Sequence, residues 1–132
     1  MIGIDTNLLV RLWTNDDPTR VARIRAHLAP LETQAESVFI NDIVLSESVW
    51  VAASLYRFDK PAILTALQAL LDTAMFAFED RATLQQAMRA WRTGRAGFAD
   101  CLIVARNRRM GCQYTATCDK TLARHEGTQA LP

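Results

Sequence analysis

The pattern of apolar and polar positions predicts short strands separated by helices. β-rich runs of about four or five residues occur at 2–5, 37–40, 75–78, 113–117 and 128–131, which is short for a helix. Helical periodicity begins near residue 7 and at residue 18, and continues over 42–56, 60–72, 81–92, 98–109 and, briefly, 120–125. Asp17-Pro18 and Pro61 are typical of helix starts, and Gly94 and Gly97 predict a break between two helices.

Short strands alternating with helices indicate an α/β fold. We expect one domain over residues 1–132, with a mostly parallel central sheet of four to five strands flanked by helices. Ligands of such sheets bind beyond the carboxyl ends of the strands. Asp5 ends the first strand and Asp119 follows the strand that ends near Thr117. Each acid has a second explanation, because Asp also caps the helix that follows a strand.

Two further acids occupy unusual helical positions. Glu47 has Ile43, Val44, Trp50 and Val51 as its helical neighbours, so we expect it on an inward face, where an unpaired charge is costly. A salt bridge to an arginine is the structural alternative. Asp100 begins its helix, where an acid also favours the helix dipole, but we expect it to face the core.

The four acids together predict a divalent cation. Two carboxylates about 4 Å apart repel by about 4 kcal/mol at an effective dielectric constant of 20, so a cluster of four needs a counter-charge. Oxygen ligands without His or Cys select a hard cation, Mg²⁺ or Mn²⁺, over zinc.

Four motifs resemble those of PIN-domain nucleases. They are Ile-Asp-Thr-Asn at 4–7, Val-Leu-Ser-Glu at 44–47, Gly-Phe-Ala-Asp at 97–100 and Thr-Cys-Asp-Lys at 117–120. The chain is most similar to the VapC-type toxins of toxin–antitoxin pairs, and the resemblance covers nearly its whole length. It implies a three-layer PIN-like fold in which Asp5, Glu47, Asp100 and Asp119 are the metal-binding and catalytic acids. Asn7 and Thr117 match supporting polar positions, and Cys118 replaces the usual aromatic or aliphatic residue.

The function that this resemblance implies is magnesium-dependent endoribonuclease activity, with Mn²⁺ as a substitute. We expect Asp5 and Asp100 to ligate the metal directly, and Glu47 and Asp119 to ligate it or to orient metal-bound water. A PIN-like module that binds RNA or protein without cleavage is the alternative. A phosphatase of the haloacid-dehalogenase type needs a second Asp two positions after the first, where this chain has Asn7.

Charge is balanced overall but not locally. The chain has fifteen Lys and Arg and fourteen Asp and Glu, which gives a formal net charge of +1. The total charge therefore does not indicate any class of binding partner. Residues 81–109 nevertheless hold seven arginines and one acid, Asp100. Five of them are candidate RNA phosphate contacts, although ordinary solvated helix faces are an equal explanation: Arg89, Arg92, Arg95, Arg106 and Arg109.

The helix expected over 42–56 is apolar nearly all round. It is either central to the core or partly covered by another chain. The resemblance implies a homodimer and a cognate antitoxin, and our candidates for those contacts are Trp13, Trp50, Leu55 and Tyr56.

The remaining features favour a cytoplasmic protein. The amino terminus lacks a basic leader, and no run approaches the roughly 18 apolar residues that span a bilayer. Three cysteines, without a CxxC pair, are expected as reduced structural thiols buried like small apolar residues.

Overall fold

Parallel strands and α-helices alternate along the chain in the computed structural model, which describes residues 1–132. They form two compact units, the N-terminal unit (Met1–Glu79) and the C-terminal unit (Asp80–Pro132).

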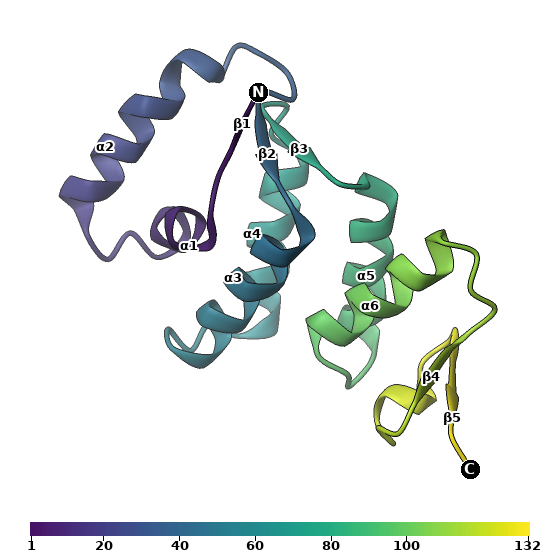
Figure 1. Ribbon diagram of the computed structural model, residues 1–132. Helices are drawn as coiled ribbons and strands as arrows, with labels where there is room; N and C mark the ends of the chain where they lie inside the picture. The colour runs from purple at the N-terminus through teal and green to yellow at the C-terminus, as the bar shows by residue number, and fades with distance from the viewer. The chain divides into compact units, whose positions relative to one another are not determined.

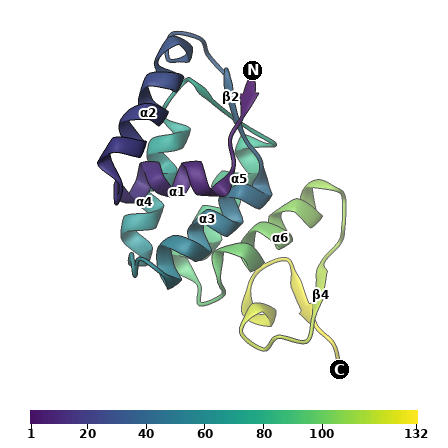
Figure 2. The ribbon, with the colours of Figure 1, turned by 60° about the vertical axis from the view of Figure 1, so that its left-hand side comes forward.

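The N-terminal unit is a three-stranded parallel sheet with four helices. The sheet order is β1-β2-β3, and Val38 of the central strand lies opposite Ile2 on one side and Phe76 on the other. The helices α1 and α3 pack on each other, and Figure 2 shows α1 running beside α3; Figure 1 views α1 along its axis. In chain order the elements are β1 (Ile2–Gly3), α1 (Thr6–Thr14), α2 (Pro18–Leu28), a 3₁₀ turn (Ala29–Leu31), β2 (Val38–Ile40), α3 (Asp42–Ser54), α4 (Lys60–Leu71) and β3 (Phe76–Phe78).

The C-terminal unit is a helical hairpin followed by two strands. α5 (Arg81–Thr93) and α6 (Phe98–Arg109) pack closely on each other (Figure 1). β4 (Thr115–Thr117) pairs in parallel with β5 (Thr128–Ala130), and the 3₁₀ helix η2 (Leu122–Arg124) connects them.

Polar caps fix where the helices begin. Asp or Asn precedes five of the six α-helices, and each side chain accepts a hydrogen bond from a backbone N–H of the first turn. The exception is α6, which follows Gly97 and has no side-chain cap. Its first turn contains Asp100, whose charge favours the positive end of the helix dipole.

Each unit has its own apolar core. The strands β2 and β3 and the helices α3 and α4 contribute buried side chains such as Ile40, Leu45 and Leu67 to the N-terminal unit. In the C-terminal unit Leu84, Trp91 and Phe98 are buried, and the two aromatic rings meet edge to face with centroids 5.5 Å apart.

The structure confirms the predicted α/β fold with parallel strands, and every expected strand and helix is present. The five strands pair as a group of three and a group of two. None of the helices has the length and apolar composition needed to cross a bilayer.

Candidate active site

Asp5 stands where the first strand passes into the first helix. The ladder of β1 extends through the backbone N–H of Ile4, which donates to the carbonyl of Phe39 at 3.2 Å. Asp5 then caps α1, its Oδ1 accepting from the N–H of Leu8 at 2.9 Å. The capping explanation and the strand-end explanation therefore both hold for this residue.

Glu47 is bound to the residue next to Asp5. The hydroxyl of Thr6 donates to Glu47 Oε1 at 2.9 Å, which links the first turn of α1 to the middle of α3. The Glu47 carboxylate therefore lies beside Thr6, the residue that directly follows Asp5 in the chain. The Thr of the Asp-Thr-Asn motif was not among the predicted site residues, although its place between two of them could have indicated it.

The expected inward position of Glu47 is wrong. Glu47 is exposed, and so are Ile43 (65%) and Trp50 (63%), which lie on the same side of α3. The buried side of the helix is formed by other residues, namely Val44, Leu45, Ser48, Val49 and Ala52. Because α3 is apolar on both sides, the sequence pattern could not distinguish them. Because Glu47 is exposed and accepts a hydrogen bond from Thr6, its charge needs no arginine partner.

Asp100 and Asp119 belong to the C-terminal unit. Asp100 is half-buried in the first turn of α6, and its side chain does not cap the helix. Asp119 is exposed, and its Oδ1 accepts from the N–H of Leu122 at 2.8 Å at the start of η2. The hydroxyl of Thr117 accepts from the Asp119 N–H at 2.9 Å, so Thr117 holds the backbone that presents this acid.

The four carboxylates suit a hard cation by their chemistry. Asp5, Glu47 and Asp119 each use one oxygen in a hydrogen bond, and the second oxygen of each has no protein partner. Such oxygens are the ligands that Mg²⁺ takes together with water. Two of the acids lie in each unit, and neither unit by itself holds three or more His, Cys, Asp or Glu side chains arranged for a metal.

Asn7 lies beside a charged cluster at the end of α1. Its Oδ1 accepts from Arg11 Nε at 3.0 Å, and Arg11 also lies 3.9 Å from Asp16. Asp16 in turn accepts a 2.6 Å hydrogen bond from the Tyr56 hydroxyl. This bond is the main reason that the pKa of Asp16 is lowered and the pKa of Tyr56 is raised.

The candidate RNA-contacting arginines have different surroundings. Arg89, Arg92 and Arg95 are exposed on α5 and just after it. Arg109 lies 3.8 Å from Asp80, the cap of α5. The pKa of Asp80 is lowered chiefly by the backbone N–H and the hydroxyl of Thr83, with a smaller contribution from Arg109.

The candidate partner contacts are mainly on α3 and just beyond it. Trp50 and Leu55 (67%) are exposed, Tyr56 is 38% exposed, and Trp13 is half-buried.

The expectation of buried cysteines is correct only for Cys101, which packs in α6. Cys112 and Cys118 are exposed, because they lie in short connections beside the three-residue strand β4.

Comparison with known proteins assigns the family of this chain, independently of the reading of its four acidic motifs. The model of the PIN domain family matches residues 2–127, so this chain belongs to the PIN domain family. The chain is similar to a VapC ribonuclease of Aquifex aeolicus (strain VF5), with 21% identity over 108 residues that cover 82% of this chain and 79% of the relative. Among solved structures it matches VapC20 of Mycobacterium tuberculosis, described as a sarcin–ricin-loop-cleaving toxin, with a TM-score of 0.42, 19% identity and 93% coverage of both chains.

Proposed function

We propose that this protein is a magnesium-dependent endoribonuclease. The observation that carries the proposal is the complete set of PIN-type acids, Asp5, Glu47, Asp100 and Asp119, in a chain whose family match spans residues 2–127. The likeness to a VapC ribonuclease supports RNA as the substrate.

The acids would be the ligand set of a divalent cation. Asp5 and Asp100 would hold it directly, and Glu47 and Asp119 would ligate it or hold its water molecules. Such an ion would supply an activated water and a positive charge to neutralise the negative charge on the phosphate.

Protein groups near the acids position them. Thr6 orients the Glu47 carboxylate and Thr117 holds the backbone of Asp119. Asn7 fixes Arg11 along α1. Positively charged side chains bind the flanking phosphates, with Arg89, Arg92, Arg95, Arg106 and Arg109 as the candidates.

The biological role that fits this activity is that of the toxin in a toxin–antitoxin pair in the cytoplasm. A toxic ribonuclease requires an inhibitor, and the exposed apolar side of α3 offers a surface for an antitoxin or for a second copy of the chain. Trp13, Trp50, Leu55 and Tyr56 are the proposed contacts.

The test is cleavage of a mixed RNA pool by the wild type and by Asp5→Asn. Asn caps a helix about as well as Asp, so the variant keeps the start of α1 while it loses a charged ligand. We expect cleavage with Mg²⁺ or Mn²⁺, none with EDTA, and a loss of at least about 100-fold in the variant, since metal-assisted charge stabilisation contributes several kcal/mol. Wild-type protein that binds RNA without cutting it would favour the non-catalytic module, and cleavage that survives EDTA would exclude the metal mechanism.

A further inference from the structure

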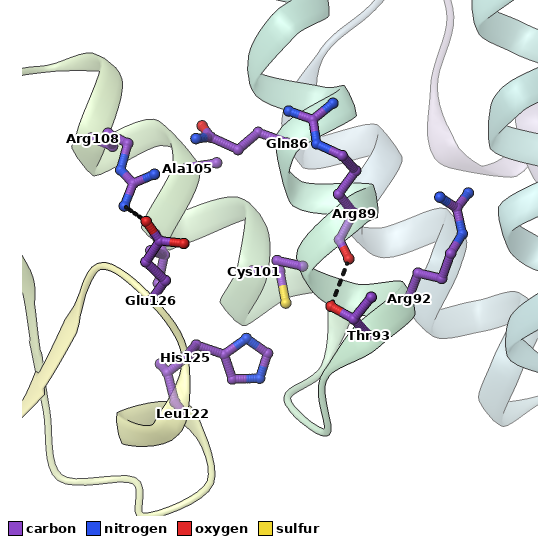
Figure 3. A pocket seen from close by; sticks show the side chains of 12 residues that line it. Gln86, Arg89, Arg92, Thr93, Cys101, Ala105, Arg108, Leu122, His125 and Glu126 are labelled. Carbon is purple, nitrogen blue, oxygen red and sulfur yellow. Dashed lines mark hydrogen bonds and ion pairs between the residues drawn. The ribbon is translucent and has the colours of Figure 1, made fainter.

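The C-terminal unit contains a cavity of about 550 Å³ between α5, α6 and the η2 segment. This volume is in the range of small-ligand sites in proteins. Figure 3 shows that its labelled side chains come from three directions, with Gln86 and Arg89 on α5, Cys101 and Arg108 on α6, and His125 directly after η2.

The polar walls of this cavity are mainly cationic. Arg89, Arg92 and Arg108 line it, and Glu126 is the one acid among the lining residues. Arg108 Nη2 lies 3.7 Å from Glu126 Oε1, but their side chains are 45% and 91% exposed, and such a pair is weak in water. Arg89 and Arg108 stand on facing walls, whereas the Arg92 side chain points away from the other labelled groups (Figure 3). Two guanidinium groups are thus available to an anion.

The interior of the cavity is apolar. Cys101, Ala105 and Leu122 are buried there, and Val104 is half-buried. An anion alone would gain nothing from these side chains. A ligand that combines an anionic group with a flat apolar part would use both the walls and the interior.

His125 adds a directed hydrogen-bond donor. Its Nε2 accepts from the backbone N–H of Ala96 at 3.2 Å, so the neutral ring carries its proton on Nδ1, which has no partner in the protein. Gly94 lies against the ring so closely that a Cβ at this position would overlap it. The ring is therefore held in place while one donor stays free at the cavity.

A second hollow, of about 450 Å³, adjoins the first. It shares Thr93, His125 and Glu126 with the cavity and adds three cationic side chains, Arg95, Lys120 and Arg124. A phosphodiester strand that leaves the cavity past His125 would meet these charges next.

We propose that this cavity binds a nucleotide, with the phosphate between Arg89 and Arg108, a polar ligand atom on His125 Nδ1 and the base on Val104, Ala105 and Leu122. A free mononucleotide and one nucleotide of an RNA strand share this chemistry. In the second case the cavity is a substrate subsite of the proposed ribonuclease, and to that extent the inference rests on the proposed function.

Isothermal titration calorimetry of the Asp5→Asn protein in EDTA tests this inference without RNA cleavage. The titrants are AMP, adenosine, inorganic phosphate and an AMP-containing tetraribonucleotide. We expect AMP to bind at least about tenfold more tightly than adenosine or phosphate. Tighter binding of the tetranucleotide than of AMP assigns the site to an RNA strand, and equal binding assigns it to a free nucleotide.

Variants in the Asp5→Asn background locate the binding. Arg89→Gln and Arg108→Gln should each weaken AMP and tetranucleotide binding at least about tenfold, because each removes a charge-assisted hydrogen bond. Val104→Phe, which fills the cavity, should abolish binding while circular dichroism shows the helices intact. Arg23→Ala on α2, an exposed arginine of the N-terminal unit, is the matched control and should change nothing.

The inference is overturned if neither AMP nor the tetranucleotide binds, if phosphate alone binds as tightly as AMP, or if the three cavity variants bind like Arg23→Ala. None of these results depends on catalysis. Wild-type protein that fails to cleave RNA would contradict the proposed function but leave nucleotide binding to be judged by its own measurement.

Discussion

The hydrogen bond from Thr6 to Glu47 connects two of the proposed catalytic motifs. Carboxylates that ligate metals are commonly oriented by a neighbouring donor, and removal of such a donor costs metal affinity or activity. Glu47 is exposed, so without Thr6 its side chain would sample several rotamers.

Replacement of this donor gives a test at the level of one side chain. Thr6→Val keeps the shape of the residue and removes the hydroxyl, and we expect RNA cleavage to fall about 10- to 100-fold. The Mg²⁺ concentration for half-maximal cleavage should rise as well. Thr6→Ser, which retains the hydroxyl, should restore both values.

A merely structural role of Thr6 would give a different outcome. Thr6→Val would then lower the melting temperature and leave the magnesium dependence of cleavage unchanged.

Among single residues, the sequence indicated the four acids, but it did not indicate the residues that bind them or those that line the cavity of the C-terminal unit. Asp5 and Asp119 could be placed at strand ends because a strand and a cap have clear local signals. Arg108 and His125 could not be recognised as cavity residues, since their importance comes from the packing of α5, α6 and η2 rather than from any local pattern.

The helix α3 illustrates what is decided at the scale of an element. Its start was predictable because Asn41 caps it, the Asn41 side chain accepting from the N–H of Val44 at 2.9 Å. Its orientation was not, because Ile43 and Trp50 are as apolar as the buried side chains of the opposite face.

One buried position of α3 is less than optimal for stability. Ser48 is completely buried and its Oγ has no hydrogen-bond partner. An unsatisfied buried polar group costs about 1–3 kcal/mol, and Ala is also the better helix former. We therefore expect Ser48→Ala to raise the free energy of unfolding by about 1 kcal/mol, measured by urea denaturation.

Ser46→Ala is the control for helix propensity, because Ser46 lies on the same helix but is only half-buried. If Ser48→Ala destabilised the protein relative to Ser46→Ala, the hydroxyl of Ser48 would have to make a favourable interaction.

For the molecule as a whole, the sequence predicted the α/β class and all five strands. It could not predict that they pair as three and two, because strands of two or three residues carry too few side chains to specify their neighbours. The PIN-type motifs were a stronger guide to the class than the strand pattern was.

Metal binding should be visible in the stability of the whole chain. A ligand that binds only the folded state, at about 100 times its dissociation constant, stabilises it by about 2.7 kcal/mol. For a chain of this size we expect Mg²⁺ or Mn²⁺ to raise the melting temperature by several degrees, and EDTA to reverse the change.

Differential scanning fluorimetry of the wild type and of Asp5→Asn would measure this effect. The variant should show a clearly smaller increase with Mg²⁺. An equal increase in both proteins would mean that the ion binds elsewhere.

Trp50 lies one helical turn beyond Glu47 and is 63% exposed, whereas Trp91 is 7% exposed. An indole in water emits at longer wavelength than one in an apolar core, so the long-wavelength side of the emission comes mainly from Trp50, since Trp13 is half-buried and Trp91 is buried. The chain thus carries an intrinsic optical probe beside one of its acids, and a blue shift of that emission would reveal when another molecule covers this side of α3.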